Sequence, residues 1–465
     1  LSVSLNDEDN ASGGHRGLCF QANFDDFPYY YHRFNLPVLN YTVCTDGNLK
    51  EVYQSQLVKS FWDGHQDSDM EVLERLLQLP LWQVPGAGEG NSYTPEIIED
   101  YLIGLIGRGN GKPVSKIERG YLLLDYHWQE NMGDFFFNKK KFPDLKMVQD
   151  IVRGAGLRLA LTINPFVSVD SKTFKEGVKE GLFVMERNSS SEKNIPALTW
   201  FKDVPVAALL DITNNKTVAW LKSKLSSLIE QDASEAVFFL DTGNTFHIPH
   251  FFTFTEPLPN PDLYKDHFIK HCMNVVKVIG VSGASSKRPK APAFVWMTPL
   301  ESSWSSLQSI IPNVLNLGVI GYPFINPGPI GGRPANHSHI PDLELFTRWW
   351  QLATFLPQLH FLTPPAAYRK AGIAPIAKKL KDIKDKIVNP LLLKYAGEAM
   401  EKSLPLIRPM WMLNPLDDLC QTIQDQFMIG DRILVAPVLQ HGQTKRAVYL
   451  PSTPEGPGVW KRATD

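Results

Sequence analysis

Residues 236–241 read Ala-Val-Phe-Phe-Leu-Asp, a short apolar run that ends in a carboxylate. Residues 120–125, Gly-Tyr-Leu-Leu-Leu-Asp, show the same pattern earlier in the chain. Short apolar runs of this kind predict buried strands of a parallel sheet, and polar residues that follow barrel strands lie where a ligand binds. Asp125 and Asp241 are therefore the first candidates for a functional site.

Short apolar runs alternate with amphipathic helical segments from about residue 76 to residue 412, which is typical of βαβ units. In one of these segments, 214–228, the apolar residues recur at helical spacing. Eight strand-helix units predict an α/β fold of the (β/α)8 type, a TIM barrel whose strands carry the site at their carboxyl ends. The eight runs are 79–84, 120–124, 157–163, 236–240, 293–297, 319–325, 356–362 and 406–412.

Two incomplete β domains are expected to flank this barrel. Residues 1–75 are rich in β-branched and aromatic residues between turn signals, and we interpret them as the remnant of an N-terminal β-sandwich domain. Residues 76–412 form the barrel, and residues 413–465 begin a truncated C-terminal β domain. The long gap between the third and fourth strands, 164–235, is expected to be an excursion inserted over the barrel mouth.

The chain has 465 residues, 43% of them hydrophobic, and 47 basic against 49 acidic residues. Near-neutral charge argues against nucleic-acid binding, and the apolar fraction is too high for a disordered chain. No stretch approaches the roughly 18 to 20 apolar residues of a membrane-spanning helix. Because the chain begins with Leu1 and reads as a fragment, we expect membrane association only through a segment outside it.

Cysteines and glycosylation sequons bear on the compartment. The four cysteines form no C-x-x-C pair and no zinc spacing, so we expect neither a metal nor another cofactor. Cys19 and Cys44 could bridge two neighbouring strands. Asn-x-Ser/Thr sequons favour the secretory-pathway lumen or the extracellular side, as in part of a single-pass membrane glycoprotein. They begin at Asn10, Asn40, Asn188, Asn215 and Asn336.

Several longer segments resemble glycoside hydrolase family 31, the retaining α-glucosidase and α-galactosidase group. Within it, the chain is most similar to the branch of the myogenesis-regulating glycosidase and the SITS-binding protein. The similar segments occur in the family's order at compatible spacings over nearly the whole chain. They are 124–128 with 133–144, 161–167, 315–324 with 330–332, 344–357, and 425–438.

The resemblance implies a retaining mechanism with two carboxyl groups roughly 5–5.5 Å apart, one nucleophilic and one acting as acid and base. The family's nucleophile, an Asp at the end of strand four, corresponds to Asp241. The family's sugar-holding Asp at the end of strand two corresponds to Asp125. From the residues alone, the alternative that Asp241 is a turn former or helix cap stays open, since Asp-Thr-Gly is good turn chemistry.

Two positions depart from the family pattern. After strand five the family carries Gly-Asp and then a polar stretch ending in Trp; aligned on Trp304, this chain has Thr298-Pro299. Proline cannot transfer a proton, so the acid/base position is lost, and Glu301 is a weak replacement. After strand six the segment 326–332 has no carboxylate before its Ile-Gly-Gly turn.

Trp128 and Trp304 are candidate stacking surfaces for a sugar. His360 is a candidate ligand contact or a hydrogen-bonded core residue. We therefore expect a family 31-like protein that hydrolyses or binds α-linked glycosides, with a carbohydrate as its partner and an undetermined oligomeric state. The alternative is a catalytically inactive homologue, a pseudoenzyme, that serves as a ligand-binding or membrane-associated interaction protein.

Overall fold

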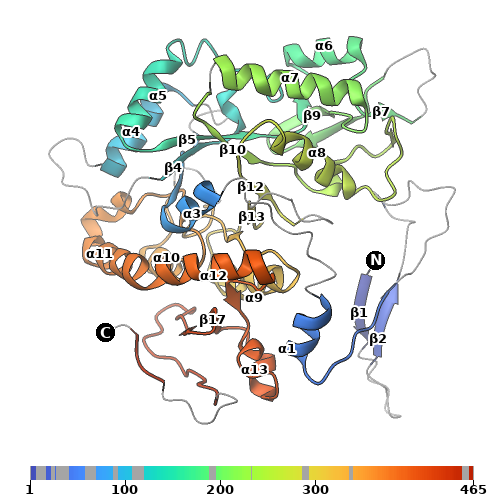
Figure 1. Cartoon of the computed structure of the whole chain (residues 1–465). Helices are drawn as coiled ribbons and strands as arrows, with labels where there is room; N and C mark the ends of the chain where they lie inside the picture. Colours follow the sequence, from blue (N-terminus) through green and yellow to red (C-terminus); the bar gives the residue numbers. More distant parts are fainter. Residues whose placement is uncertain are drawn as a thin grey trace.

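The structure is a computed structural model of the chain, shown in Figure 1. It describes residues 2–6, 17–21, 27, 41–57, 70–86, 93–106, 120–187, 195–231, 233–284, 293–334, 339–452 and 460–463. All structural statements below concern these residues.

A parallel eight-stranded sheet forms the centre of the molecule, and neighbouring strands are hydrogen-bonded in the order β14-β13-β12-β10-β5-β4-β3-β15. The sheet curls into a barrel whose end strands are β14 and β15. The amide of Ile330, four residues after β14, donates to the carbonyl of His360 in β15 over 2.8 Å. The predicted (β/α)8 barrel is confirmed. Its strands are β3 (Leu81–Gln83), β4 (Tyr121–Leu124), β5 (Arg158–Ile163), β10 (Val237–Leu240), β12 (Val278–Ser282), β13 (Phe294–Trp296), β14 (Ile325–Asn326) and β15 (His360–Phe361).

Helices surround the barrel because each has one apolar face that must be buried. In α7 (Asn215–Gln231) the buried face is made by Leu221, Leu225 and Leu228, at the spacing seen in the sequence. Figure 1 shows α4, α5 and α7 above the strands and α9 to α12 below them. The other long helices are α3 (Met70–Gln78), α4 (Pro95–Ile106), α5 (Leu145–Gly154), α6 (Lys172–Glu180), α8 (Leu263–Met273), α9 (Trp304–Val319), α10 (Leu343–Thr354), α11 (Ala374–Ile383) and α12 (Asn389–Lys402).

One of the eight predicted runs is not a barrel strand, and one barrel strand was missed. The strand β12 was missed because Gly280 weakens its apolar pattern; a Cβ at Gly280 would lie 2.3 Å from Trp296 Nε1, so glycine allows the two strands to pack. The run 406–412 is not a barrel strand, because its strand β16 (Ile407–Arg408) pairs antiparallel with β17 (Phe427–Ile429). The run at 293–297 is therefore the sixth barrel strand, and Asn326 ends the seventh.

The segment between the third and fourth barrel strands folds into its own antiparallel sheet of β6 (Phe166–Ser168), β9 (Val204–Leu209) and β8 (Leu198–Phe201). The turn between β8 and β9 consists of Lys202 and Asp203, and Lys202 adopts a positive φ of 53°. Two shorter strands, β7 (Met185–Glu186) and β11 (Phe252–Thr253), pair beside it. The tip of this hairpin reaches the barrel mouth, as the contacts of Lys202 below show.

The chain ends add two small sheets. At the N-terminus β1 (Ser2–Asn6) pairs antiparallel with β2 (Gly17–Gln21). At the C-terminus β16, β17 and β18 (Ile433–Val435) form a three-stranded antiparallel sheet. Cys44, Cys272 and Cys420 have free thiols, and the side chain of Cys19, the other member of the bridge left open by the sequence, lies outside the described residues.

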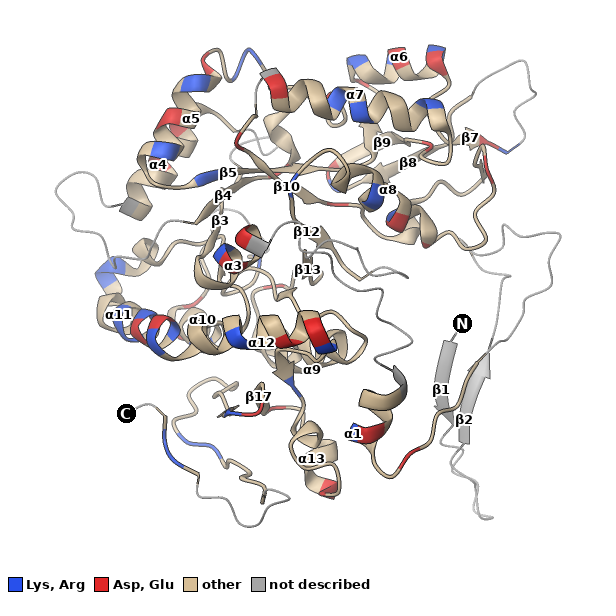
Figure 2. Ribbon diagram, in the orientation of Figure 1, with Lys and Arg blue, Asp and Glu red and all other residues tan. Residues whose placement is uncertain are grey.

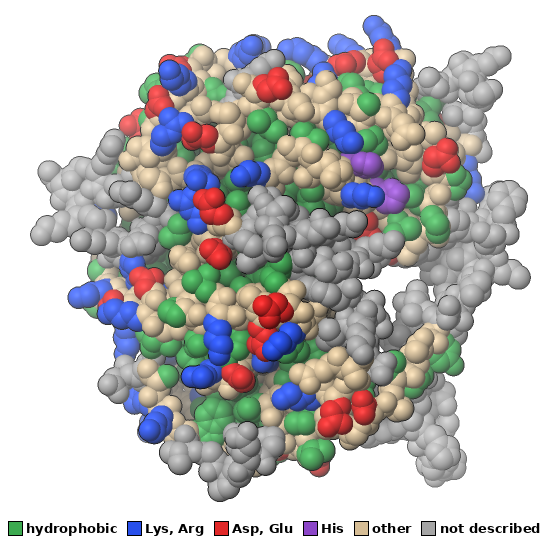
Figure 3. All heavy atoms as spheres, in the orientation of Figure 1, with side chains coloured by type: hydrophobic (Ala, Val, Ile, Leu, Met, Phe, Trp, Pro, Cys, Tyr) green, Lys and Arg blue, Asp and Glu red, His purple; other side chains and the backbone are tan. Residues whose placement is uncertain are grey.

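The surface carries both signs of charge. Figures 2 and 3 show lysines and arginines interspersed with aspartates and glutamates over the visible face, with no large basic area there. This pattern agrees with the near-neutral composition. None of the helices in the described ranges is long and apolar enough to cross a membrane.

The barrel core gives a stability prediction. Phe238 lies in β10, is fully buried and stands three residues before Asp241. We expect Phe238→Ala to lower the free energy of unfolding by about 3–5 kcal/mol, since it leaves a cavity in the core. Urea unfolding measures this change.

The matched control is Phe251→Ala, at a position where the side chain is 64% exposed. It should change the free energy of unfolding by less than about 0.5 kcal/mol. Equal losses in the two variants would contradict the central place of β10 in the core.

Candidate functional site at the barrel mouth

The two aspartates predicted from strand ends both lie at the barrel mouth. Asp125 directly follows β4, and Asp241 directly follows β10, with β5 between these two strands. The amide of Asp241 donates to the carbonyl of Ile163 over 2.9 Å, which continues the strand pairing to the site. The two side chains are only 16% and 13% exposed. The register of the barrel therefore brings them together, as the resemblance implied.

Lys202 joins the two carboxylates. Its Nζ lies 3.0 and 3.1 Å from the two oxygens of Asp125, and 2.7 Å from Oδ2 of Asp241. The ammonium also lies 5.5 Å from the centre of the Tyr126 ring and 5.6 Å from that of Phe201. One ammonium from the inserted hairpin thus binds both strand-end aspartates.

Electrostatics reinforce this arrangement. Burial opposes charge on both partners, but the neighbouring ammonium of Lys202, with Arg333 and His127, holds the pKa of Asp125 below its ordinary value. The carboxylates of Asp125 and Asp241 outweigh burial at Lys202 and raise its pKa. Both groups are therefore charged at neutral pH.

The other residue of the hairpin tip, Asp203, anchors the turn to the segment after β4. It accepts a hydrogen bond from Tyr126 Oη and lies 2.9 Å from His127 Nε2. Burial lowers the pKa of His127 to about 4, despite the opposing charge of Asp125. His127 is therefore neutral at pH 7, and its contact with Asp203 is a hydrogen bond rather than an ion pair.

The position of the general acid holds no carboxylate. Thr298 and Pro299 are exposed in the turn after β13, the sixth strand rather than the fifth. Glu301 is exposed as well, and its backbone forms a bridge with Arg333. At the end of β14, Asn326 is fully buried and accepts a hydrogen bond from the Gly328 amide. The acidic charge of this mouth thus comes from the ends of β4 and β10.

The three ring-bearing residues predicted to contact a sugar lie in different surroundings. Trp128 is fully buried and donates to the carbonyl of Thr162 over 2.9 Å, so in this structure it offers no face to a sugar. Trp304 begins α9, is partly buried and packs edge-on against His441. His360 is 2% exposed, and its Nε2 lies 3.0 Å from Gln83 Oε1. Of the two interpretations left open by the sequence, these observations favour the hydrogen-bonded core residue. Burial and the charge of Arg333 lower the pKa of His360 to about 3.

Two cationic residues of the mouth were missed by sequence reasoning. Lys202 lies in the excursion predicted over the mouth, and its Lys-Asp pair between two apolar strands was the available turn signal. Arg333 follows the two glycines after β14. Its charge lowers the pKa of His360 and contributes to the lowered pKa of Asp125. No local pattern marked Arg333.

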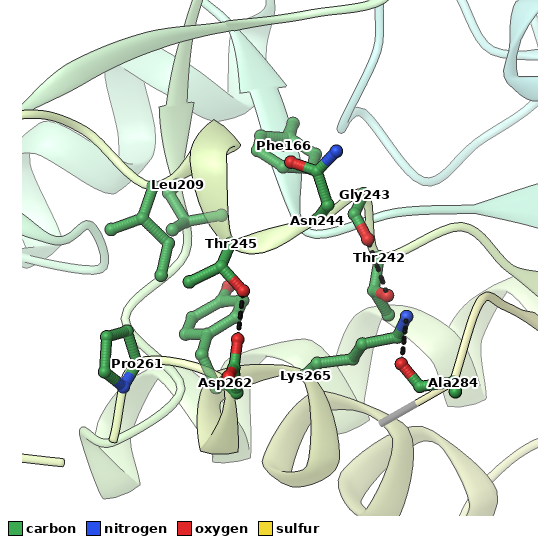
Figure 4. A pocket seen from close by; sticks show the side chains of 12 residues that line it. Phe166, Leu209, Thr242, Gly243, Asn244, Thr245, Pro261, Asp262, Lys265 and Ala284 are labelled. Atoms are coloured by element: carbon green, nitrogen blue, oxygen red, sulfur yellow. Dashed lines mark hydrogen bonds between the residues drawn. The ribbon is translucent and has the colours of Figure 1, made fainter. Parts of the chain in front are cut away.

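A cavity of about 340 Å³ adjoins the mouth, and the three residues after Asp241 line it (Figure 4). Lys265 extends across it toward the carbonyls of Ser282 and Ala284. Burial lowers the pKa of Lys265 to about 8, and the charge of Asp241 opposes this shift. Across the described ranges, no group of three His, Cys, Asp or Glu side chains could hold a metal ion.

A nearly closed (β/α)8 barrel with aspartates at the ends of its second and fourth strands has the architecture of a retaining glycoside hydrolase. The family model described as "Glycosyl hydrolases family 31 TIM-barrel domain" matches residues 115–274 and 282–371. The model described as "Glycosyl hydrolase family 31 C-terminal domain" matches residues 403–463. The chain belongs to glycosyl hydrolase family 31, and the resemblance inferred from its sequence is confirmed.

Two curated relatives agree with the branch that the sequence indicated. The myogenesis-regulating glycosidase of Mus musculus is 29% identical over 459 residues, which are 96% of this chain and 60% of the relative. The SITS-binding protein of Tetronarce californica is 32% identical over 427 residues, 89% of this chain and 57% of the relative. The chain therefore spans about 60% of the length of these relatives.

Solved structures share the fold. The Flavobacterium johnsoniae GH31 dextranase complexed with glucose matches with a TM-score of 0.68 at 19% identity, over 88% of this chain and 50% of the dextranase. A GH31 α-xylosidase from a soil metagenome, complexed with xylose, matches with a TM-score of 0.66 at 20% identity, over 88% of this chain and 61% of that enzyme. At these identities the likeness shows the fold alone.

The buried imidazole of His360 predicts a pH dependence of stability. Its pKa of about 3 in the folded chain lies below the ordinary value, so the unfolded chain binds the proton first. Stability falls as pH decreases from about 6.5 toward 3. Between pH 6.5 and pH 5, we expect the wild type to lose about 2 kcal/mol more unfolding free energy than His360→Gln, which cannot titrate.

Urea unfolding at the two pH values measures the difference, because all other titrating groups are shared. His441→Gln is the control, since the side chain of His441 is 72% exposed. A pH dependence of His360→Gln that runs parallel to the wild type would show that His360 takes up its proton without cost in the folded chain.

Proposed function

We propose that this family 31 protein binds a carbohydrate at its barrel mouth and does not hydrolyse unactivated glycosides. The observation that carries the proposal is the ammonium of Lys202, bonded to both Asp241 and Asp125. Of the two functions considered from the sequence, the geometry thus favours the catalytically inactive, ligand-binding homologue over the hydrolase.

The first argument concerns the nucleophile. A carboxylate attacks the anomeric carbon with a free oxygen lone pair, and the second carboxyl group of a retaining site stands opposite it. Here Oδ2 of Asp241 accepts a short ionic hydrogen bond from Lys202. This bond lowers the nucleophilicity of Asp241, and the ammonium lies where the sugar would have to be attacked.

The second argument concerns the leaving group. Proton transfer from a general acid contributes typically about 10² to 10⁴-fold to such a reaction. Pro299 has no proton to give, and Glu301 is exposed in the turn beyond it. An alkyl glycoside, whose leaving group is a strong base, should therefore remain intact in this mouth.

Binding a sugar requires neither a free nucleophile nor a proton donor. Carboxylates and an ammonium offer charged acceptors and donors to sugar hydroxyls, and the rings of Tyr126 and Phe201 lie beside them. The names of the structural neighbours complexed with glucose and xylose support a sugar as the ligand class. A polyhydroxylated ligand can exchange hydrogen bonds with the three charged groups without a reaction at its anomeric carbon.

The catalytic half of the proposal is tested with methyl α-glycosides and 2,4-dinitrophenyl α-glycosides of glucose, galactose and xylose. We expect no hydrolysis of the methyl glycosides by the wild type, because both a free nucleophile and an acid are lacking. With dinitrophenyl glycosides and azide, Lys202→Ala should release dinitrophenol faster than the wild type, since Asp241 is then free. Sugar release and absorbance measure the two reactions.

Lys224→Ala is the matched control, because Lys224 pairs with Glu176 outside the mouth. Hydrolysis of a methyl glycoside that disappears in Asp241→Asn would overturn the proposal and make the protein a glycosidase. Azide-dependent release already present at full rate in the wild type would contradict the part assigned to Lys202.

The binding half is tested by calorimetry with the same methyl glycosides. We expect Asp241→Asn to keep the dissociation constant within about threefold, since the amide retains an oxygen acceptor. Asp125→Ala should raise the dissociation constant about tenfold or more, because it removes a charged acceptor. Absence of binding of every neutral and acidic sugar to the wild type would refute a carbohydrate site.

A further inference from the structure

Arg333 is held at the mouth by its backbone. It follows Gly331 and Gly332, whose φ values of 87° and 73° belong to the left-handed region. A Cβ at Gly332 would stand 2.6 Å from the carbonyl oxygen of Glu301, so glycine permits the two loops to approach. The Arg333 amide donates to Leu300 O over 2.8 Å, and the Ser302 amide donates to Arg333 O over 3.0 Å. These bonds tie the loop after β14 to the loop after β13.

The guanidinium of Arg333 has unmet hydrogen-bonding capacity. Its Nε is buried and has no hydrogen-bond partner among the described residues. Arg333 lies in the loop after β14, on the carboxyl side of the barrel strands, and its charge lowers the pKa values of Asp125 and His360. A buried cationic donor without a partner is unfavourable, which makes it a strong site for an incoming anion.

The carboxylates around the mouth form their hydrogen bonds with other side chains. Asp125 and Asp241 both bind Lys202, and Asp203 binds Tyr126 and His127. Each acidic group of the hairpin and strand ends is thus engaged with another residue. Arg333 supplies a planar fork of donors that matches a carboxylate or a sulfate in two parallel hydrogen bonds.

We propose that Arg333 binds an anionic substituent of the ligand, so that the sugar taken at the mouth is acidic. The proposal rests on the carbohydrate-binding function above and specifies its ligand class. The shared chemistry is a carboxylate or a sulfate ester on a pyranose ring. Neutral sugars contact the aspartates and Lys202 but leave the guanidinium unpaired.

Calorimetry with matched ligand pairs tests this preference. The pairs are methyl α-glucoside against methyl α-glucuronide and methyl α-glucoside 6-sulfate, with the galactose series alongside, and inorganic sulfate as a separate arm. We expect the acidic sugar to bind at least about tenfold more tightly than its neutral counterpart, as charged hydrogen bonds allow. This preference should shrink at high ionic strength.

Arg333→Gln should abolish the preference and leave the affinity for the neutral sugar unchanged, while Arg333→Lys should keep part of it. Arg153→Gln is the matched control, at an arginine on α5 that is 59% exposed and pairs with Asp150 and Glu235. Urea unfolding of Arg333→Gln checks that the variant remains folded, so that a lost preference reports lost anion binding.

The outcomes separate the two proposals. Equal affinity for neutral and acidic sugars, unchanged in Arg333→Gln, would overturn the acidic ligand and keep the carbohydrate site. Sulfate binding that requires Arg333, without binding of any sugar, would support the anion site and overturn the carbohydrate function. A preference for acidic sugars that survives in Arg333→Gln would overturn the assignment to Arg333.

Discussion

The structure of the mouth depends on one ammonium placed between two aspartates. Two largely buried carboxylates at the ends of β4 and β10 repel each other, and one of them would take up a proton unless a cation were present. Lys202 supplies that cation from outside the barrel framework, at the tip of the β8–β9 hairpin. The hairpin, the two strand ends and the segment after β4 are thereby linked in one electrostatic unit, which Asp203 extends to Tyr126 and His127.

This unit combines the family 31 barrel with an ammonium between its strand-end aspartates. The barrel still directs Asp125 and Asp241 to the same mouth, because the register of β4, β5 and β10 fixes where these strands end. In the turn after β13, Pro299 has no proton to donate. Together with the ammonium bound to Asp241, this turn underlies the proposal that the chain does not hydrolyse unactivated glycosides.

The pairing of charged groups within the chain also determines what the mouth offers to a ligand. Its carboxylates are satisfied within the chain, whereas the guanidinium of Arg333 is not. The proposed anionic substituent would pair with this donor, because the tertiary fold decides which charged groups pair and which stay available.

The sequence by itself determined the barrel and the two strand-end aspartates, because strand periodicity and the convergence of parallel strands act locally and repeat. It missed β12, where Gly280 interrupts the apolar pattern, and it assigned 406–412 to the barrel because an antiparallel buried strand has the same composition as a parallel one. Only the tertiary structure showed that Lys202 meets Asp125, 77 residues away in sequence, that Trp128 is enclosed, and that Nε of Arg333 has no hydrogen-bond partner among the described residues. These contacts depend on where the β8–β9 hairpin and the glycine turn before Arg333 lie relative to the barrel strands. No short stretch of sequence determines that arrangement.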